Sequence, residues 1–391
     1  MSSRFVNPAI SAVPPSAIRR FFDIAGTMKD AISLGVGEPD FVTPFPVRNT
    51  AIDSLLDGET SYTANAGILP LREEISWYLK NRFQLEYAPE DEVLVTVGAS
   101  EAIDIALRAL VRPGDEVLIP EPCYISYQAC TLFASGVPVS VPTRAENDFE
   151  LLAEDLKKRI TKKSRVLVLS YPSNPTGAVM PLERLKAVAE LAIKHDLFVI
   201  CDEIYAELCY EGFTQHSIAS LPGMRERTMV VSGFSKAFAM TGFRLGYLCA
   251  PRAIVAACAR IHQYTIMCAS RQSQVASYNA LKQGRESNYA DVSRMRESYD
   301  RRRRLMVQSF RDMGLSCFEP RGAFYTFPSI RHTGLSSEQF CERLLNEQHV
   351  VTVPGNAFGP SGEGHIRCCY ATATEKLVEA FARIALFLES L

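Results

Sequence analysis

Residues 228–247 read TMVVSGFSKAFAMTGFRLGY, and they join a strand-like run to a chemically unusual loop. The run TMVVSGF (228–234) is almost continuously apolar, which is typical of a strand that helices cover on both faces. Lys236 then stands alone among small and apolar residues, and Arg244 follows eight residues later. A buried ammonium group is costly unless its pKa falls or it enters a covalent bond. By itself, the stretch does not decide between a covalently used lysine and a lysine on a solvated turn.

Earlier runs have the same apolar texture and alternate with helix-like segments. These runs are EVLVTVG (92–98), DEVLIPEP (115–122), RVLVLSYP (165–172) and FVICDE (198–203). Two segments between them are candidate helices, SEAIDIALRALV (100–111) and MPLERLKAVAELAIKHD (180–196), and the second has apolar residues at helical spacing. This alternation of buried strands and helices predicts an α/β domain.

The residue pattern of the chain changes after residue 290. A charged stretch (286–314) predicts a helix that bridges two domains, and for its RRRR run (301–304) we favour a solvated helix face over an anion site. The strand-like runs GAFYTFPS, HVVTVPG and EGHIRCCYATA and a final helix from Thr374 then predict a small α+β domain. The predicted parts are therefore an N-terminal arm with part of the small domain (1–44), a large domain (45–290) and a small C-terminal domain (291–391).

Charge and cysteine content narrow the functional classes. The net charge of −2 and the pI of about 6.4 lack the positive excess of nucleic-acid binders and polybasic membrane anchors. No apolar run approaches transmembrane length, and no signal-peptide core is present at the N-terminus. The 11 cysteines form no C-x-x-C pair and the 6 histidines stand apart, which argues against disulfides and zinc. We expect a cytoplasmic enzyme without a metal, a nucleic-acid partner or a membrane.

Several short stretches fall at the ends of predicted strands, where α/β sheets place their ligands. In TVGAS (96–100), small residues lead from strand to helix, so the N–H groups of Ala99 and Ser100 can approach an anion. In YPSNPTG (171–177), two prolines make the loop rigid and leave Asn174 as a fixed amide donor. Taken singly, each stretch is also compatible with an ordinary turn.

Three further polar residues stand in apolar surroundings. Asp202 ends the run FVICD, where a carboxylate must be paired, protonated or hydrogen-bonded. Tyr205 lies three residues later, on the same side if the chain turns helically. Arg367, in GHIRCCYATA, is either a surface residue or a two-pronged clamp for a carboxylate.

Together these groups match the needs of pyridoxal 5′-phosphate. The Lys236 amine can form a Schiff base with the aldehyde of this cofactor. Asp202 can pair with the pyridinium nitrogen, while Asn174 and Tyr205 can hydrogen-bond the ring hydroxyl oxygen. We predict catalytic roles for Lys236, Asp202 and Tyr205. The groups predicted to bind the phosphate are Ser235, Arg244 and the N–H groups near Ala99 and Ser100.

The same residues lie in motifs that resemble those of class I and II aminotransferases, within the fold-type I family of pyridoxal-phosphate enzymes. In order, these motifs are SLGVGEPDF (33–41), SYTANAGILPLR (61–72), YPSNPTG (171–177), CDEIY (201–205), SGFSKAFAMTGFRLGY (232–247) and VPGNAFGPSGEGHIRCCYA (353–371). The chain is most similar to the bacterial aspartate, aromatic and acetyl-diaminopimelate group, of the aminotransferase A type. The resemblance implies a seven-stranded, mainly parallel sheet in the large, cofactor-binding domain. It also implies a homodimer with shared active sites and a ping-pong transfer, through Lys236, from an L-amino acid to a 2-oxo acid, with 2-oxoglutarate expected.

The resemblance implies further roles that the residue pattern alone does not assign. It places Tyr124 against the cofactor ring. It assigns Gly37, Asn174 and Arg367 to the α-carboxylate of the substrate. It sends the hydroxyl of Tyr62 to the cofactor phosphate of the neighbouring subunit.

The chain also departs from the family pattern. Some relatives have a serine three residues before the lysine, where this chain has Gly233. Ser232 and Ser235 flank that position, and we choose Ser235 first and Ser232 second as phosphate ligands. Some relatives with acidic substrates have a basic residue at Ser100, so its absence disfavours a strict aspartate enzyme. Four aromatic residues are candidates either for a substrate side-chain pocket or for the core: Tyr124, Tyr264, Phe324 and Tyr325.

Other functions remain as alternatives. A carbon–sulfur β-lyase that uses the same lysine is the main one, because motifs barely encode which bond to Cα is broken. A regulator that reuses this fold would have an added DNA-binding domain, which we do not expect here. A dinucleotide oxidoreductase is suggested by GVG at 35–37, but no G-x-G-x-x-G opens a helix after a first strand.

Overall fold

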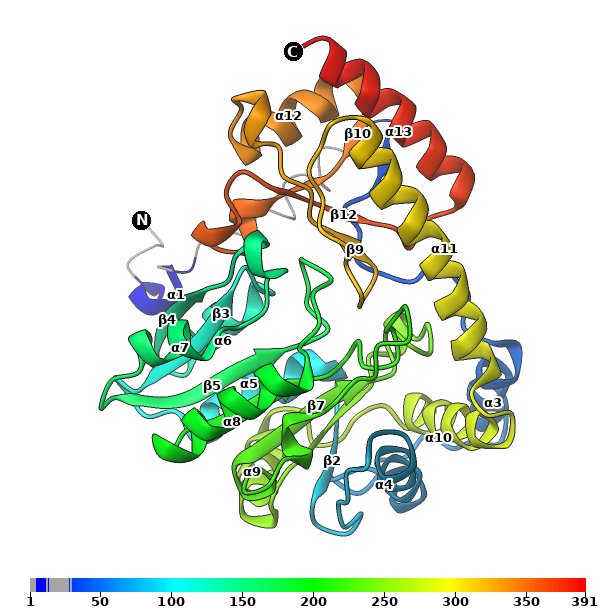
Figure 1. Cartoon of the computed structure of the whole chain (residues 1–391). Helices are drawn as coiled ribbons and strands as arrows, with labels where there is room; N and C mark the ends of the chain where they lie inside the picture. The colour runs from blue at the N-terminus through cyan, green and yellow to red at the C-terminus, as the bar shows by residue number, and fades with distance from the viewer. Residues whose placement is uncertain (1–4, 12, 14–27, 29) are drawn as a thin grey trace.

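A seven-stranded sheet forms the centre of the larger part of the molecule (Figure 1), in a computed structural model that describes residues 5–11, 13, 28 and 30–391. The strand order is β2-β8-β7-β6-β5-β3-β4, and all neighbours are parallel except the two pairs that include β8. The strands are β2 (Val93–Thr96), β3 (Glu116–Glu121), β4 (Val137–Pro142), β5 (Ser164–Ser170), β6 (Phe198–Asp202), β7 (Thr228–Gly233) and β8 (Gly246–Cys249). The five apolar runs of the sequence are β2, β3, β5, β6 and β7, and the predicted fold class is confirmed.

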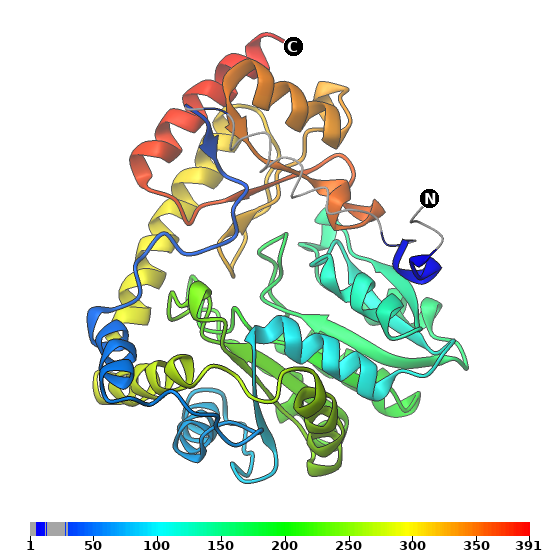
Figure 2. The ribbon, with the colours of Figure 1, turned by 180° about the vertical axis from the view of Figure 1, so that it is seen from behind.

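Helices cover both faces of this sheet, as Figure 2 shows from behind. Alternate strand residues point to opposite faces, so Val166 and Val168 pack with one set of helices and Leu167 packs with the other. The first set is α5 (Gly98–Leu110) and α9 (Arg252–Thr265), with α6 (Ser126–Phe133) beside α5. The other side has α7 (Ala153–Arg159), α8 (Leu182–Lys194), α4 (Leu69–Phe83) and α10 (Arg271–Glu286). Both sides bury apolar clusters, which explains the continuous apolar runs.

A smaller α+β part lies above the carboxyl ends of the parallel strands (Figure 1). Its helices are α11 (Ala290–Asp312), α12 (Ser337–Gln348) and α13 (Thr374–Glu389). Its strands are β9 (Tyr325–Thr326), β11 (Val353–Pro354) and β12 (Ile366–Cys369) in one antiparallel sheet, and β1 (Ile32–Ser33) parallel to β10 (Val350–Val351). The early strand β1 therefore joins the C-terminal part of the chain. Two further helices come before the first strand of the large sheet, the short α1 (Pro8–Ser11) and α3 (Phe45–Leu56). The boundaries predicted for the domains stay a prediction.

The four arginines at 301–304 lie on α11 and do not share one face. Arg303 is fully buried and pairs with Glu211 (2.6 Å) and Asp300 (2.9 Å), and Arg302 is 12% exposed. Successive residues of an α-helix are rotated by about 100°, so four in a row cannot all face solvent. The predicted solvated face is therefore wrong for Arg302 and Arg303 and holds for their exposed neighbours, Arg301 and Arg304.

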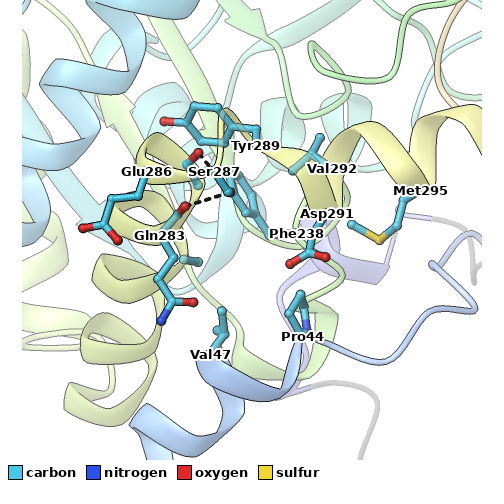
Figure 3. A pocket seen from close by; sticks show the side chains of 12 residues that line it. Pro44, Val47, Phe238, Gln283, Glu286, Ser287, Tyr289, Asp291, Val292 and Met295 are labelled. Carbon is cyan, nitrogen blue, oxygen red and sulfur yellow. Dashed lines mark hydrogen bonds between the residues drawn. The ribbon is translucent and has the colours of Figure 1, made fainter.

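A cavity of about 350 Å³ lies where α3, α10 and α11 meet, at the junction of the two parts. Figure 3 shows residues that line it, among them Pro44, Val47, Phe238, Val292 and Met295. Asn288 and Tyr289 have φ values of +51° and +56°, and this left-handed stretch separates α10 from α11.

None of the helices in the described part of the chain is long and apolar enough to span a membrane.

Candidate active site

A second cavity, of about 370 Å³, opens at the carboxyl ends of β2, β5, β6 and β7, beneath the smaller part. Both parts of the molecule contribute to its wall. Of the residues predicted for the site, the structure brings together Gly37, Ala99, Ser100, Tyr124, Asn174, Asp202, Tyr205, Ser235, Lys236, Arg244 and Arg367. Segments far apart in the sequence thus converge on one space.

Lys236 lies in the loop that follows β7 and points into this cavity. Its Nζ donates a hydrogen bond to the carbonyl oxygen of Gly37 (2.6 Å) and lies 5.9 Å and 5.7 Å from the ring centres of Tyr205 and Phe324. The side chain is half-buried because it borders open space, while protein encloses the amine elsewhere. This burial lowers the pKa of Lys236 to about 8. The neutral, nucleophilic form of the amine is therefore accessible near neutral pH.

Asp202 ends β6 and lies at the base of the cavity with 4% exposure. Its Oδ2 accepts a hydrogen bond from the hydroxyl of Tyr127 (2.7 Å), and its Oδ1 accepts one from the N–H of Ile204 (3.2 Å). Burial raises the pKa of Asp202, and these hydrogen bonds oppose the shift. The site thus contains a buried carboxylate that two hydrogen bonds hold in place.

Two tyrosines meet beside Lys236. The hydroxyl oxygens of Tyr205 and Tyr325 are 2.8 Å apart, and both side chains are buried. Burial raises the pKa of Tyr205 well above its usual value, so this phenol stays protonated at neutral pH. One hydroxyl of the pair can donate to the other, which leaves a donor for a cavity ligand.

Arg367 enters the cavity from β12 and is fixed on several sides. Its guanidinium carbon lies 4.6 Å and 4.8 Å from the ring centres of Tyr325 and Phe358. Nη1 donates to Oδ1 of Asn174 (2.9 Å), and Nη2 donates to the carbonyl oxygen of Gly35 (2.5 Å). A guanidinium has five N–H donors, so further donors remain, and its buried Nε has no partner among the described residues. Arg367 is thus a rigid, incompletely used donor of hydrogen bonds to an anion.

Another part of the cavity wall is built around the start of α5. Gly98 has φ of +74°, and a Cβ atom there would come within 2.9 Å of Nη2 of Arg244. A Cβ at Gly246 would come within 2.5 Å of the Ala99 nitrogen. Glycine therefore permits the guanidinium and the neighbouring strand to approach the first turn of the helix. The N–H groups of that turn, together with Ser235 and Arg244, form a cradle suited to an anion.

Two residues predicted for the site do not line this cavity. Ser232 lies within β7, and its hydroxyl donates to the carbonyl oxygen of Glu203 (3.4 Å). Ser235, in the loop after the strand, is the serine that lines the cavity, whereas Ser232 does not line it, and its choice as second phosphate ligand stays a prediction. Tyr62 is 80% exposed and outside the cavity lining of its own chain.

Several residues that line the cavity were not predicted as site residues, and two of them, Tyr127 and Tyr325, are tyrosines; the others are Val36, Glu38, Ile103, Ser170, Ile204 and Thr241. Tyr127 is the hydrogen-bond donor to Asp202, and Tyr325 was only a candidate for a side-chain pocket. Spacing offered a signal for Tyr127, because it follows the predicted Tyr124 by one helical turn. Of the other aromatic candidates, Tyr264 is exposed and Phe324 is fully buried beside the site. Among the residues that the structure describes, no His, Cys, Asp and Glu side chains cluster in a way that could hold a metal ion.

The chain is similar to known proteins in both sequence and fold. The family model for aminotransferase class I and II matches residues 29–384. YugH of Bacillus subtilis, whose name gives it as a candidate aminotransferase, is 55% identical over 98% of each chain. The aspartate aminotransferase of Pyrococcus abyssi is 46% identical over 96% of each chain. The solved structure of the aromatic aminotransferase from Pyrococcus horikoshii is 44% identical, covers 95% of this chain and 99% of its own, and superposes with a TM-score of 0.90.

Proposed function

Since this chain belongs to the family of class I and II aminotransferases, we propose that it transfers the amino group of an L-amino acid to 2-oxoglutarate by a ping-pong reaction at Lys236. The chain is a pyridoxal-phosphate-dependent enzyme, as members of this family are. The observation that carries the proposal is the convergence of a neutralisable amine, a buried carboxylate and a fixed guanidinium in one cavity.

The cavity fits the cofactor because it contains a buried carboxylate that, within the described part of the chain, has no cationic partner at hydrogen-bond distance. Burial raises the pKa of Asp202 despite the hydrogen bond from Tyr127. A protonated pyridine nitrogen would supply the missing positive charge and favour the ionised carboxylate. When bound, pyridoxal phosphate supplies an electron-withdrawing ring that stabilises negative charge at the substrate Cα. Asp202 would keep that ring protonated, and Tyr127 would keep the carboxylate in position.

The remaining groups of the cavity would hold the cofactor at its other edges. Tyr124 would lie against the ring face, since its own ring packs edge-on against Tyr127 at 5.7 Å. Asn174 and Tyr205 would donate hydrogen bonds to the ring hydroxyl oxygen. Asn174 is suited to this because its Oδ1 accepts from Arg367, which leaves the NH₂ group as a donor. The phosphate would be held by Ser235, Arg244 and the N–H groups of Ala99 and Ser100.

Arg367 would bind the α-carboxylate of the substrate as a two-pronged donor, with help from Asn174 and the backbone at Gly37. Its two aromatic neighbours and two hydrogen bonds fix the guanidinium before substrate arrives, so little conformational entropy is lost on binding. Lys236 would then remove the proton from the substrate Cα. The pKa of about 8 suits this task, because a general base is most effective when its pKa is near the working pH.

We extend the proposal to a homodimer in which Tyr62 reaches the phosphate site of the partner subunit. Tyr62 and Tyr264 are 80% and 86% exposed, and Phe45 and Leu56 are exposed as well. The segments of Tyr62 and Tyr264 are linked, since Asn65 donates to the carbonyl oxygen of Met267 (2.7 Å). Exposed aromatic side chains on two linked segments, as Tyr62 and Tyr264 are, favour a subunit interface there. The location in the cytoplasm stays a prediction from the sequence.

The donor is proposed to be an aromatic or aliphatic amino acid. Within the described lining, the basic side chains are Lys236, Arg244 and Arg367, and each has a proposed role other than contact with the substrate side chain. An acidic side chain would therefore need a cation from the partner subunit. The relatives have names for both aspartate and aromatic enzymes, so both donor classes belong in the test.

The experiment is a panel of L-amino acids incubated with the purified enzyme and cofactor, with and without 2-oxoglutarate. Amino transfer predicts glutamate as a product, formed in proportion to the 2-oxo acid of the donor and only when 2-oxoglutarate is present. A carbon–sulfur β-lyase predicts pyruvate and ammonia from cysteine-type donors without any 2-oxo acid. Release of pyruvate and ammonia in place of glutamate would replace the proposed reaction by the lyase.

A further inference from the structure

We propose that Arg302 and Asp40 are a pair of positioning residues that hold residues 35–43 over the substrate cavity. We call residues 35–43 the strap, because they run from β1 in the smaller part to α3 in the larger part and border the cavity on the way. The inference rests on the proposed function, which assigns Lys236 and Arg367 to the cofactor and the substrate. It gives a role to one of the inward-facing arginines of the run at 301–304.

Two contacts that hold the strap come from groups that the reaction needs. The carbonyl oxygen of Gly37 accepts from Lys236 (2.6 Å), and the carbonyl oxygen of Gly35 accepts from Arg367 (2.5 Å). In the proposed function, Lys236 binds the cofactor and moves a proton, and Arg367 binds the substrate carboxylate. The hydrogen bond from Lys236 cannot persist through these steps. The strap therefore needs a tether that does not depend on the reacting groups.

Asp40 and Arg302 provide such a tether. Nη1 of Arg302 lies 2.8 Å from Oδ1 of Asp40, with 12% and 27% of the two side chains exposed. The Arg302 guanidinium lies 5.5 Å from the ring centre of Phe41, and that ring packs edge-on against Tyr299 at 5.5 Å. The buried Nε of Arg302 has no partner within the described residues. Loss of Asp40 would thus leave a largely buried guanidinium unpaired, which is more costly than loss of a surface ion pair.

Apart from the packing of Phe41 against the core of the smaller part, the strap has few other contacts with the described residues that could replace this pair. Its far end is fixed where the hydroxyl of Thr43 donates to the carbonyl oxygen of Ala239 (2.5 Å). Beyond that point, Pro44 and Val47 border the cavity between α3, α10 and α11, as Figure 3 shows. Between Gly37 and Thr43, the other side-chain hydrogen bond of the strap joins Thr241 to Glu38 at 3.5 Å, a long distance for such a bond. The pair on α11 therefore fixes the middle of the strap.

The position of the strap matters for substrate more than for cofactor. Val36 and Gly37 line the substrate cavity, and a Cβ atom at Gly37 would collide with the hydroxyl of Tyr325. Small displacements of the strap therefore change the space beside Arg367. The proposed phosphate ligands, in contrast, lie on α5 and on the loop after β7. A loosened strap should weaken substrate binding and leave cofactor affinity unchanged.

The test compares Arg302→Gln with Arg301→Gln in the enzyme loaded with cofactor. Arg301 is the matched control, because it is the neighbouring arginine of the same run and is exposed. Loss of a charge-assisted hydrogen bond should raise KM for the amino acid and the 2-oxo acid about tenfold in Arg302→Gln, with kcat changed less than about threefold. Cofactor affinity should match the wild type, and Arg301→Gln should change neither constant. Equal KM values in the two variants, or an effect confined to cofactor affinity, would overturn the proposal.

Two further measurements keep the proposal testable if substrate kinetics are disturbed. Asp40→Asn should raise KM as Arg302→Gln does, and the double variant should be no worse than either single one, because both remove the same pair. Fully additive effects would show that the residues act separately. Arg302→Lys should restore part of the lost affinity, since it keeps the charge.

Hydrogen exchange on the cofactor-free protein tests, independently of catalysis, whether Asp40 and Arg302 hold the strap. Amides of residues 35–43 should exchange faster in Arg302→Gln and Asp40→Asn than in wild type and Arg301→Gln. Unchanged exchange rates in the strap would contradict the proposed role of the pair, even if the enzyme transaminates. Failure of the wild type to transaminate would instead reject the proposed function, and the exchange result would still decide whether the pair holds the strap.

Discussion

Two arginines line the active-site cavity, Arg367 from β12 and Arg244 from the loop after β7, and they differ in how completely the chain fixes them. Arg367 is 4% exposed, lies between two aromatic rings and donates to Asn174 and Gly35. Arg244 is exposed, and its Nη1 donates to the carbonyl oxygen of Thr241 (3.0 Å). The proposed substrate site at Arg367 is therefore preorganised within one chain, whereas the proposed phosphate cradle at Arg244 is open.

This difference indicates where the partner subunit matters. A preorganised site loses little entropy when its ligand binds, so Arg367 can select the α-carboxylate by geometry. An exposed arginine acts mainly as a charge until other groups surround it. The proposed completion by the ligand phosphate and by Tyr62 of the partner subunit would supply those groups. The four predictions below test this contrast, from the largest effect to the smallest.

The largest effect is expected from the amine that lines the same cavity. Lys236→Ala should lower turnover by more than about 10³-fold, because it removes both the nucleophile and the general base. The cofactor should still bind, since its other proposed ligands are intact. Absorbance after gel filtration measures bound cofactor, and borohydride treatment followed by mass spectrometry should find cofactor covalently attached to the wild type and absent from the variant. Substantial turnover in the variant would remove Lys236 from the reaction.

Conservative replacement of each arginine tests the contrast directly. Arg367→Lys keeps the charge and loses the fork, so kcat/KM should fall about 10- to 100-fold for every amino acid tried, as expected for a lost charge-assisted hydrogen bond of about 1.5–3 kcal/mol. Arg244→Lys should mainly loosen the cofactor, with kcat/KM within about threefold of wild type at saturating cofactor. Steady-state kinetics and cofactor titration of both variants provide the comparison. If kcat/KM falls for only one amino acid in Arg367→Lys, Arg367 contacts the side chain of the substrate instead of its α-carboxylate.

Tyr62→Phe tests whether the open phosphate cradle is completed by the partner subunit. The lost hydrogen bond to phosphate should raise the cofactor dissociation constant about tenfold. In mixed dimers of Tyr62→Phe with Lys236→Ala, the site with the intact lysine should regain normal cofactor affinity, because its tyrosine comes from the other chain. A control dimer of wild type with a chain carrying both changes should keep its lysine-containing site loose. Persistent looseness in the first mixed dimer and normal affinity in the control would mean that Tyr62 acts within its own chain.

The smallest effect concerns the pH dependence of cofactor capture by the cofactor-free protein. Burial lowers the pKa of Lys236 to about 8, so the neutral amine is already half populated at that pH. The rate of covalent cofactor attachment should therefore rise only about twofold between pH 8 and pH 10, whereas a lysine with an ordinary pKa would gain on the order of 70-fold. Stopped-flow absorbance measures this rate. A steep rise up to pH 10 would show that the amine is not perturbed by its surroundings.

The sequence predicted the strands that a short run of neighbouring residues is enough to identify. Continuous apolar runs identified five of the seven strands, β2, β3, β5, β6 and β7, since burial on both faces leaves few polar positions. The edge strand β4 (Val137–Pro142) was missed because it is only partly buried and contains two prolines. The strand β8 (Gly246–Cys249) was missed because its first residues were read as part of the Lys236 motif.

At the site, the motifs pointed to eleven residues that line the cavity, and they gave no sign of contacts that depend on packing. Tyr127 follows a predicted residue by one helical turn, but nothing in the sequence shows that its hydroxyl meets Asp202. The inward turn of Arg302 likewise depends on the way that α11 lies against the strap. The sequence also did not show that Ser232 lies inside β7, away from the cavity lining, because the end of this strand cannot be read from the motif.

The central claim, that Lys236 and Arg367 serve one amino transfer in a shared cavity, is tested most directly by the isolated half-reaction. Enzyme loaded with cofactor is mixed with an aromatic L-amino acid in the absence of any 2-oxo acid, and the products are counted per active site. The account predicts one equivalent of the corresponding 2-oxo acid, no free ammonia, and one equivalent of glutamate when the separated enzyme then meets 2-oxoglutarate. Both yields should vanish in Lys236→Ala. Repeated turnover with release of ammonia in the first step, or full yields from Lys236→Ala, would contradict it.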